Sequence, residues 1–257
     1  MKIKVFLKLF VPYGIIKYKK GVIRQFIKFF IPYGIFLLWK KKYCPLCEKK
    51  AVFKSFGIKP RENALCPNCM SLERHRLLWI YLHEKTNLFN NFNLRILHIA
   101  PERCFSDILV KKYKNYLTGD LYKPNVMEKI DITDIKYPDE SFDIIICNHV
   151  LEHIPDDIKA MSEFFRVLSK GGWAILLVPV FSLEKTYEDF SIDTPEGRLN
   201  AFGQSDHVRK YGQDYIDRLR SVGFNVTITK AEDFLSRRKM KKMGIINETM
   251  FHCVNPV

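Results

Sequence analysis

The chain has 257 residues, of which 47% are hydrophobic, with 12 glycines and 12 prolines. This length and composition are typical of a folded globular protein, and they exclude a disordered or fibrous chain. The formal net charge is +14, but residues 1–43 contribute 11 positive charges and no acidic side chain, which leaves +3 for the remainder. The basic character therefore belongs mainly to the N-terminal arm, and the total charge is weak evidence for nucleic-acid binding.

The N-terminal arm, residues 1–43, contains an internal repeat. FLKLFVPYGI at residues 6–15 recurs as FIKFFIPYGI at residues 26–35. Aromatic bulk combined with exclusively positive charge is typical of a segment that lies in the interface of an anionic bilayer. The segment also resembles the basic Pro-Tyr-Gly leaders of some bacterial surface-glycan enzymes. Two other interpretations remain open: a pair of helices packed on the body, and contact with nucleic acid.

The same arm also indicates where in the cell the protein is found. Its longest uncharged run, residues 29–39, is too short to span about 30 Å of hydrocarbon. Prolines and glycines interrupt its apolar stretches, and no small-residue cleavage site follows, so we expect no signal peptide. We therefore expect a cytoplasmic protein with peripheral contact at the inner face of the membrane.

Four of the seven cysteines form two CPxC pairs separated by 18 residues: Cys44, Cys47, Cys66 and Cys69. This spacing is typical of a tetrahedral structural zinc site, in which each tight turn supplies two thiolates. It also favours a reducing compartment over a secreted disulfide framework. We expect a zinc ribbon over residues 44–70, with small strands that include Phe53, Phe56 and Ile58. The alternative is four reduced cysteines without a metal.

Residues 71–85 predict an amphipathic helix directly after the second cysteine pair. Ser71 is a plausible N-cap, and apolar residues follow at helical spacing. Arg74, His75 and Arg76 are candidates for contact with phosphate or an acidic substrate. A solvated helix face is the alternative for these three residues.

Residues 131–180 organise the rest of the chain. The apolar run at residues 142–147 predicts a buried strand, and three-and-four spacing of apolar residues predicts a helix over 156–168. We expect Gly171 and Gly172 to stop that helix before a second strand at 173–180. Strand, helix and strand in this order predict a parallel sheet, whose ligands bind at the carboxyl ends of the strands. The residues at that end are Asn148, His149, Glu152 and His153.

The sequence FDIIICNHVLEHIPDD, followed by a helix, KGG and an apolar strand, resembles class I S-adenosylmethionine-dependent methyltransferases of the type 11-like group. The resemblance covers roughly residues 94–254. It implies an α/β fold with a doubly wound, mostly parallel seven-stranded sheet, here within a domain of residues 71–257. It also implies S-adenosylmethionine as the cofactor.

The resemblance places the cofactor loop after a first strand at residues 95–100. The family carries an acidic residue and a Gly-x-Gly-x-Gly loop here, whereas this chain has no glycine between His98 and Cys104. His98 is an expected cofactor contact at this turn. Ala100 and Pro101 are expected to shape a close turn, and Glu102 to meet the cofactor's ammonium group. Loss of cofactor binding is the alternative.

Acidic residues after the next two strands complete the expected cofactor site. A strand at 116–120 ends at Asp120, where a carboxylate accepts hydrogen bonds from ribose hydroxyls in nucleotide-binding α/β folds. Asp131 and Ile132 match the family position at which an acidic side chain contacts the adenine amino group. A surface aspartate is the alternative for Asp131. Asn148, at the end of the fourth strand, is the last expected cofactor contact.

The HVLEH sequence has the spacing of a zinc-peptidase HxxEH motif. Such a site needs a long helix, and Pro155, two residues after His153, disfavours one here. The cluster resembles the Glu/His group of methyltransferases that activate vicinal hydroxyls, with His207 as a further partner. A second metal near His149, Glu152, His153 and His207 thus stays open beside a purely loop-stabilising role. His149 and His207 are the candidate catalytic bases.

Residues 181–210 form a polar connection too long for a bare loop, so we expect it to overhang the active cleft. Asp206, His207 and Arg209 are its residues best suited to acid–base or anion-binding work. After it we expect a helix over 211–222, strands at 224–229 and 250–254, and an exposed basic loop, RRKMKK, between them.

These features predict methyl transfer from S-adenosylmethionine, with a glycan, nucleotide-sugar or lipid-linked acceptor at the membrane face. One alternative is an RNA methyltransferase, because CPLC knuckles ahead of such a domain are similar to those of some ribosomal RNA enzymes. The other is a non-catalytic zinc scaffold that has lost the cofactor loop.

Overall fold

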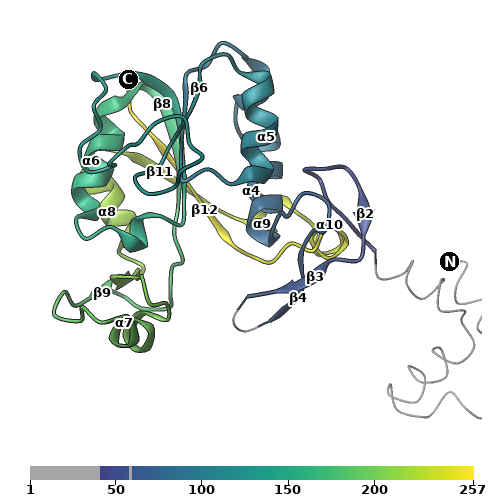
Figure 1. Ribbon diagram of the computed structural model, residues 1–257. Helices are drawn as coiled ribbons and strands as arrows, with labels where there is room; N and C mark the ends of the chain where they lie inside the picture. The colour runs from purple at the N-terminus through teal and green to yellow at the C-terminus, as the bar shows by residue number, and fades with distance from the viewer. Residues whose placement is uncertain (1–40, 58–59) are drawn as a thin grey trace, which may run out of the picture.

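The computed structural model describes residues 41–57 and 60–257 (Figure 1). The repeat-bearing arm, apart from its last residues, and Ile58 lie outside the described residues. A six-stranded sheet with the order β11-β12-β8-β7-β5-β6 forms the centre of the molecule. Its strands are β5 (Ile96–Ile99), β6 (Tyr116–Gly119), β7 (Phe142–Asn148), β8 (Leu168–Leu177), β11 (Asn225–Lys230) and β12 (Thr249–Val254).

The sheet is mostly parallel. Strands β6, β5, β7 and β8 run in one direction, β12 is antiparallel to β8, and β11 is antiparallel to β12. The predicted α/β class and mixed parallel sheet are therefore confirmed, with strand boundaries that shift by a few residues.

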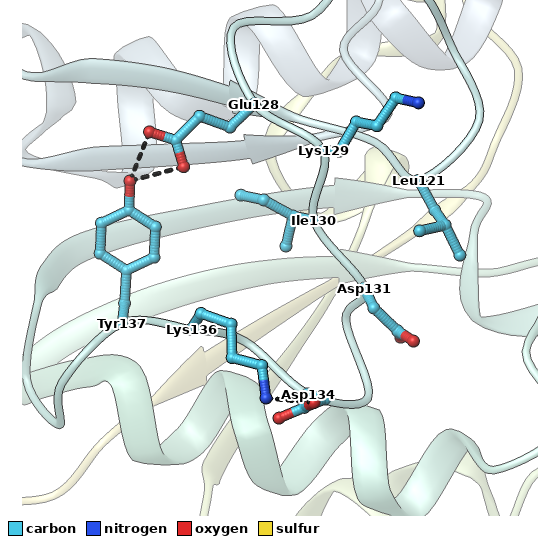
Figure 2. Close-up of a pocket in the computed structure, with 8 residues that line it drawn as sticks. All are labelled: Leu121, Glu128, Lys129, Ile130, Asp131, Asp134, Lys136 and Tyr137. Atoms are coloured by element: carbon cyan, nitrogen blue, oxygen red, sulfur yellow. Dashed lines mark hydrogen bonds and ion pairs between the residues drawn. The ribbon is translucent and has the colours of Figure 1, made fainter.

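The sequence predicts seven strands in the sheet, whereas the described residues form six. Where a further strand beside β6 was expected, the chain makes one parallel bridge between Gly119 and Glu128. The segment then runs along the sheet edge to Tyr137, whose hydroxyl donates to the Glu128 carboxylate at 2.8 Å (Figure 2). Pro124 lacks an amide hydrogen, which disfavours a longer edge strand.

Helices cover both faces of the sheet, as a doubly wound fold requires (Figure 1). On one face lie α4 (Glu73–Lys85) and α5 (Arg103–Lys112), and on the other lie α6 (Asp157–Val167) and α8 (Tyr215–Ser221). Short elements join them: η1 (Leu88–Asn90), η2 (Leu151–His153), β9 (Tyr187–Glu188), α7 (Pro195–Phe202), β10 (Arg209–Lys210), α9 (Ala231–Phe234) and α10 (Arg237–Met243).

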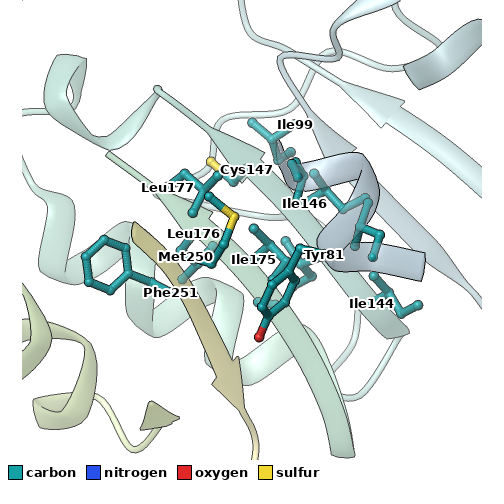
Figure 3. Close-up of a cluster of buried hydrophobic side chains, with 14 of the residues drawn as sticks. Tyr81, Ile99, Ile144, Ile146, Cys147, Ile175, Leu176, Leu177, Met250 and Phe251 are labelled. Atoms are coloured by element: carbon teal, nitrogen blue, oxygen red, sulfur yellow. The ribbon is translucent and has the colours of Figure 1, made fainter. Parts of the chain in front are cut away.

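The core is built by the apolar runs that the sequence marked as buried strands. Ile144 and Ile146 of β7 lie beside Ile175 of β8, with Tyr81 of α4 packed over them (Figure 3). Burying one such aliphatic side chain contributes about 1.5–3 kcal/mol. The sheet is therefore stabilised by its own apolar content.

The strand that follows α6 begins earlier than expected. The helix ends at Val167 and β8 starts at Leu168, so Gly171 and Gly172 lie within the strand and do not stop the helix. The pairing with β7 shifts register here, and Gly171 has a φ of +72°. A side chain on Gly172 would lie 2.8 Å from the Asp143 carbonyl oxygen, so the two glycines permit a bulge and close backbone contact.

The basic RRKMKK segment is a helix, not an exposed loop. It forms most of α10, which packs against the N-terminal strand pair β1 (Lys42–Tyr43) and β2 (Lys50–Ala51). Met240 is buried, and the Lys42 ammonium donates to the Lys241 carbonyl at 2.7 Å. The hairpin β3 (Lys54–Phe56) and β4 (Arg61–Leu65) completes the N-terminal region.

Candidate functional site

The four paired cysteines converge on one point. Their sulfur atoms all lie within 4.8 Å of one another, with Cys44 to Cys69 at 3.5 Å and Cys47 to Cys66 at 3.8 Å. A zinc ion with Zn–S bonds of about 2.3 Å sets tetrahedral sulfur–sulfur separations of about 3.8 Å. The four thiols therefore already have the spacing of a zinc tetrahedron.

Both cysteine pairs adopt the same turn. Glu48 and Met70, each directly after the second cysteine of a pair, have φ values of 56° and 60°. Ser71 does not cap α4 through its side chain; the N-cap is Leu72, and the Ser71 hydroxyl lies 3.3 Å from the Cys44 sulfur. We call residues 42–71, which carry these turns and both small hairpins, the cysteine module.

Helix α4 joins the cysteine module to the sheet. Arg76 is fully buried, stacks 4.5 Å from the centre of the Phe53 ring and donates to the backbone carbonyls of Ser71 and Gly244. His75 is buried as well. A solvated face is therefore wrong for both residues, and Arg76 is engaged by the protein itself.

The loop after β5 is where the cofactor turn was expected. Ala100 has a φ of 48°, a left-handed conformation that glycine adopts far more readily. Its amide donates to the Gly119 carbonyl at 2.8 Å, which ties the loop to the end of β6. Pro101 follows, and Glu102 is the N-cap residue of α5. Ala100 thus takes a backbone conformation that the family supplies with glycine.

Glu102 is the centre of a buried polar network. Its carboxylate lies 3.0 Å from His98 Nε2, 3.2 Å from Asn148 Nδ2 and 3.6 Å from His75 Nε2. Burial alone raises the pKa of Glu102, but the His98 hydrogen bond and the two histidines outweigh it and lower that pKa to about 2. Glu102 is therefore an anion held at the carboxyl ends of β5 and β7.

His98 and Asn148 have different positions around this anion. His98 is fully buried and uses its other ring nitrogen on the Tyr116 hydroxyl at 2.8 Å, so it orients Glu102 from within the sheet. The Asn148 amide oxygen is buried and has no hydrogen-bond partner within the described part of the chain. Of the two, Asn148 retains a polar atom for a ligand.

Asp120 lies directly after β6, beside the Ala100 loop. Its Oδ1 accepts from the backbone amides of Tyr122 and Lys123, both at 2.8 Å. The Lys123 ammonium donates to the Ala100 carbonyl at 3.2 Å and lies 3.8 Å from Asp120 Oδ2. Oδ1 therefore fixes the loop, while Oδ2, among the described residues, is paired with the Lys123 ammonium only. Lys123 was not singled out from the sequence, because its link to Ala100 spans two strands.

Asp131 borders a cavity of about 350 Å³ at the sheet edge (Figure 2). Its Oδ1 accepts from the amide and hydroxyl of Thr133, and neighbouring Ile132 is buried. The cavity is lined by Leu121, Glu128, Lys129, Ile130, Asp131, Asp134, Lys136 and Tyr137. Of the expected cofactor residues, only Asp131 lines this cavity.

The segment after β7 carries one candidate base, His149, and lies beside the other, His207. His149 has a φ of 55°, and its Nδ1 lies 3.2 Å from Glu152 Oε1. The three-residue helix η2 contains Glu152 and His153, so the long helix of a zinc peptidase is not formed here. His207 comes from the 181–210 connection, and its ring lies 4.7 Å from that of His153. Burial lowers the pKa of His207.

The 181–210 connection lies at the carboxyl end of β8, at the opposite end of the molecule from the C terminus (Figure 1). Arg209 is 1% exposed and donates to Glu188 at 2.9 Å and to the Leu151 carbonyl at 3.0 Å. It anchors the connection and is not free to bind a ligand anion. Asp206 is exposed and faces His153.

A further ion-pair network fixes this connection. Asp157 pairs with Arg218 at 3.0 Å and accepts from the Tyr211 hydroxyl at 2.7 Å, while Glu188 pairs with Arg218 at 2.8 Å. No local pattern in the sequence indicated it, because its members come from four separate segments. Its effect is to hold the chain carrying His207 against η2.

Comparison with known proteins agrees with this architecture. Residues 105–176 match the methyltransferase domain family. An uncharacterized methyltransferase of Bacillus subtilis, YcgJ, is 37% identical over 76 residues, which are 30% of this chain and 28% of that protein. The ubiquinone/menaquinone biosynthesis C-methyltransferase UbiE of Vibrio vulnificus is 39% identical over 62 residues, covering 23% and 24%.

The crystal structure of the Bacillus subtilis YcgJ protein is similar to this chain with a TM-score of 0.46 and 15% sequence identity, over 72% of this chain and 99% of that one. The chain spans about a quarter of the length of the curated relatives it matches. The matched segment contains β6, β7 and α6 with most of α5 and β8, whereas β5, which pairs with β6 and β7, lies before it. Residues 105–176 are therefore similar to the methyltransferase domain family, and the mostly parallel, helix-covered sheet is the fold expected for a domain of that family.

Proposed function

We propose that this protein transfers a methyl group from S-adenosylmethionine to an acceptor bound at the carboxyl edge of the sheet. The observation that carries the proposal is the convergence of Ala100, Glu102, Asp120 and Asn148 at the ends of β5, β6 and β7. Ligands of open parallel sheets bind at this edge. A methyltransferase family match over residues 105–176, which include β6 and β7 but not β5, supports it.

Three of these four residues, together with their neighbours, have a chemical role in the proposal. Asp120 Oδ2, which lies 3.8 Å from the Lys123 ammonium, accepts from the ribose hydroxyls, and the anionic Glu102 faces the ammonium group of the cofactor. The Ala100–Pro101 turn lets the backbone approach the methionine end, and Asp131 with Ile132 borders the adenine. His98 acts through Glu102, which it orients by its 3.0 Å hydrogen bond.

The cofactor supplies an activated methyl group on a sulfonium, so the protein's contribution is alignment and exclusion of water. His149 lies at the end of β7 beside Asn148, and its ring contacts Glu152. An acceptor hydroxyl placed here would lose its proton to His149. The fold of the 181–210 connection over the end of β8 supports a covered acceptor site.

We also propose that the cysteine module holds a structural zinc ion. Four thiols at tetrahedral separations use every ligand position, which is typical of structural and not catalytic sites. The Ser71 hydroxyl, 3.3 Å from Cys44 and 3.2 Å from Cys69, would stabilise thiolates there.

The acceptor is proposed to be a glycan, a nucleotide-sugar or a lipid-linked intermediate at the membrane face. This part rests on the composition of residues 1–40, which lie outside the described residues. In residues 41–57 and 60–257, no helix is both long and apolar enough to cross a membrane. The proposal therefore places the contact in the arm.

Titration with S-adenosylmethionine tests the enzymatic assignment. Asp120→Ala should bind the cofactor at least tenfold more weakly, since a hydrogen bond to a charged group contributes about 1.5–3 kcal/mol. Asp120→Asn should lose less, because its amide oxygen still accepts. Asp217→Ala, at an exposed position of α8, is the matched control.

Equal affinities of wild type and Asp120→Ala would place the cofactor elsewhere. If the wild-type protein bound no cofactor at all, the chain would be a zinc-binding scaffold with the fold of an enzyme.

Deletion of residues 1–40 tests the membrane contact and leaves strand β1 intact. The truncated protein should no longer sediment with anionic vesicles, because each basic residue near such a surface contributes on the order of 1 kcal/mol. Its affinity for S-adenosylmethionine should stay within about twofold of the full chain, a change of roughly 0.4 kcal/mol. Equal sedimentation of both proteins would disprove the interfacial role.

A further inference from the structure

Glu152, His153 and His207 form a second cluster of metal-ligand side chains, separate from the four cysteines. One ligand atom from each lies within 4.8 Å of the other two. Glu152 and His153 are neighbours in η2, whereas His207 is more than fifty residues further along the chain. The Val208 amide donates to the Glu152 carbonyl at 2.9 Å, so the backbone itself fixes His207 beside η2.

Two atoms of this cluster are buried without a partner. Glu152 is 1% exposed and His207 is 3% exposed. Glu152 Oε2 and His207 Nδ1 have no hydrogen-bond partner among the described residues. A buried polar atom left unsatisfied costs about 1–3 kcal/mol, and such atoms in native proteins commonly meet a water or an ion. Two of them in one cluster indicate a bound species.

The remaining contacts orient the ligand atoms. His153 Nδ1 lies 3.1 Å from the Asp206 carbonyl oxygen, which can only accept, so Nδ1 carries the hydrogen and Nε2 keeps its lone pair. Glu152 Oε1 faces His149 Nδ1, which leaves Oε2 available. Metal-bound histidines and carboxylates are usually held by outer partners of these kinds.

We propose that Glu152, His153 and His207 bind a divalent transition-metal ion such as zinc. Two imidazoles and one carboxylate suit zinc, iron or cobalt, whereas magnesium and calcium prefer oxygen ligands throughout. Around a tetrahedral ion with bonds of about 2.1 Å, donor atoms lie about 3.4 Å apart. One ligand atom of each residue lies within 4.8 Å of the others, so the side chains need to move closer together to bind the ion, and the side chain of His153, 31% exposed, has room to move.

Three protein ligands leave one coordination position open, as in catalytic zinc sites. Glu152 of the cluster contacts His149 at the end of β7, so the open position takes an oxygen donor bound next to His149. If methyl transfer is the function, that donor is a hydroxyl of the acceptor. This last consequence rests on the proposed function, whereas the metal site does not.

Metal content of the full-length protein tests the site without any measurement of activity. Wild type and variants are equilibrated with zinc chloride, dialysed against metal-free buffer and analysed for zinc. Glu152→Gln and His153→Gln should each contain one zinc ion fewer per chain than wild type. In a zinc titration, each variant should bind this zinc more than tenfold more weakly. His83→Gln, at an exposed position of α4, should retain the wild-type content.

Cobalt chloride identifies the ligands. With zinc left in the cysteine module, cobalt should give a weak visible spectrum of nitrogen and oxygen ligation, without the intense sulfur-to-cobalt absorption of a thiolate site. Glu152→Gln should lose that spectrum. If Glu152→Gln does not fold, His153→Gln decides, since its side chain is partly exposed.

Equal zinc content in wild type and both folded variants would overturn the proposal. Because no cofactor is present in these measurements, failure of S-adenosylmethionine binding would leave this result unchanged, and the two proposals fail separately.

Discussion

In the central sheet, β7 and β8 bury an almost unbroken run of aliphatic side chains, whereas the cysteine module buries few. Its buried apolar residues among those described are Leu46, Phe53 and Ala64, together with Cys44 and Cys66. A region this small cannot supply a hydrophobic core that outweighs its loss of chain entropy. The sheet is therefore stabilised by its own apolar content, whereas the module needs a further source of stability, which a zinc ion bound by the four cysteines would supply.

Replacing a cysteine ligand is expected to give the largest effect. Cys44→Ser should release zinc and unfold the cysteine module, because zinc binding to such modules is worth about 10–16 kcal/mol and is linked to their folding. Hydrogen exchange should then show lost protection in residues 42–71, with protection retained in β7 and β8.

The control is Cys253→Ser, a buried cysteine of β12 that lies outside the cluster. It should retain zinc while losing some stability. Retained protection of the module in Cys44→Ser would show that the module does not depend on metal.

The same contrast explains what the sequence could predict. The cysteine cluster follows from two short spacings, and the parallel sheet follows from apolar runs and the helix between them. Ala100, Glu102 and Asp120 were expected at one edge because the strand order of the family brings strand ends together.

Features that depend on distant partners could not be predicted in this way. From the sequence, Arg209 is expected to be an exposed cation. In the structure it is buried, and it donates to Glu188 and to the backbone carbonyls of Leu151 and Pro155. RRKMKK reads as a solvated loop, but β1 gives α10 a surface to pack on. In both cases tertiary contacts outweigh local polarity.

Acid should destabilise the junction between the two regions, where His75 of α4 faces Glu102. Burial lowers the pKa of His75 from 6.5 to about 4, although the Glu102 charge opposes this shift. Below pH 6.5, His75 takes up a proton in the unfolded chain but stays neutral in the folded protein. The free energy of unfolding therefore falls as the pH falls toward 4. One pKa unit corresponds to about 1.4 kcal/mol, which gives a loss on the order of 3 kcal/mol.

Urea unfolding of wild type and His75→Gln at pH 7 and pH 4.5 measures this effect. The glutamine oxygen can still accept from the Leu72 amide, as His75 Nδ1 does at 3.1 Å. The variant should lose less stability between the two pH values than wild type. An equal loss in both proteins would show that other groups cause the acid sensitivity.

The smallest expected effect concerns Ala100, where the sheet departs from the glycine-rich loop of its family. A non-glycine residue in the left-handed region costs about 1–2 kcal/mol, part of which the greater flexibility of glycine in the unfolded chain offsets. Ala100→Gly should therefore stabilise the protein by about 1 kcal/mol and raise its melting temperature by roughly 2–4 °C.

Ala100→Val separates strain from packing, because a β-branched side chain is disfavoured at this φ whatever space surrounds it. It should destabilise the protein and weaken cofactor binding, whereas Ala100→Gly should bind S-adenosylmethionine at least as well as wild type. Destabilisation by glycine would mean that the methyl group of Ala100 makes a contact worth more than the strain. The loop would then be built around alanine, and glycine would be the poorer residue at the edge that holds the cofactor.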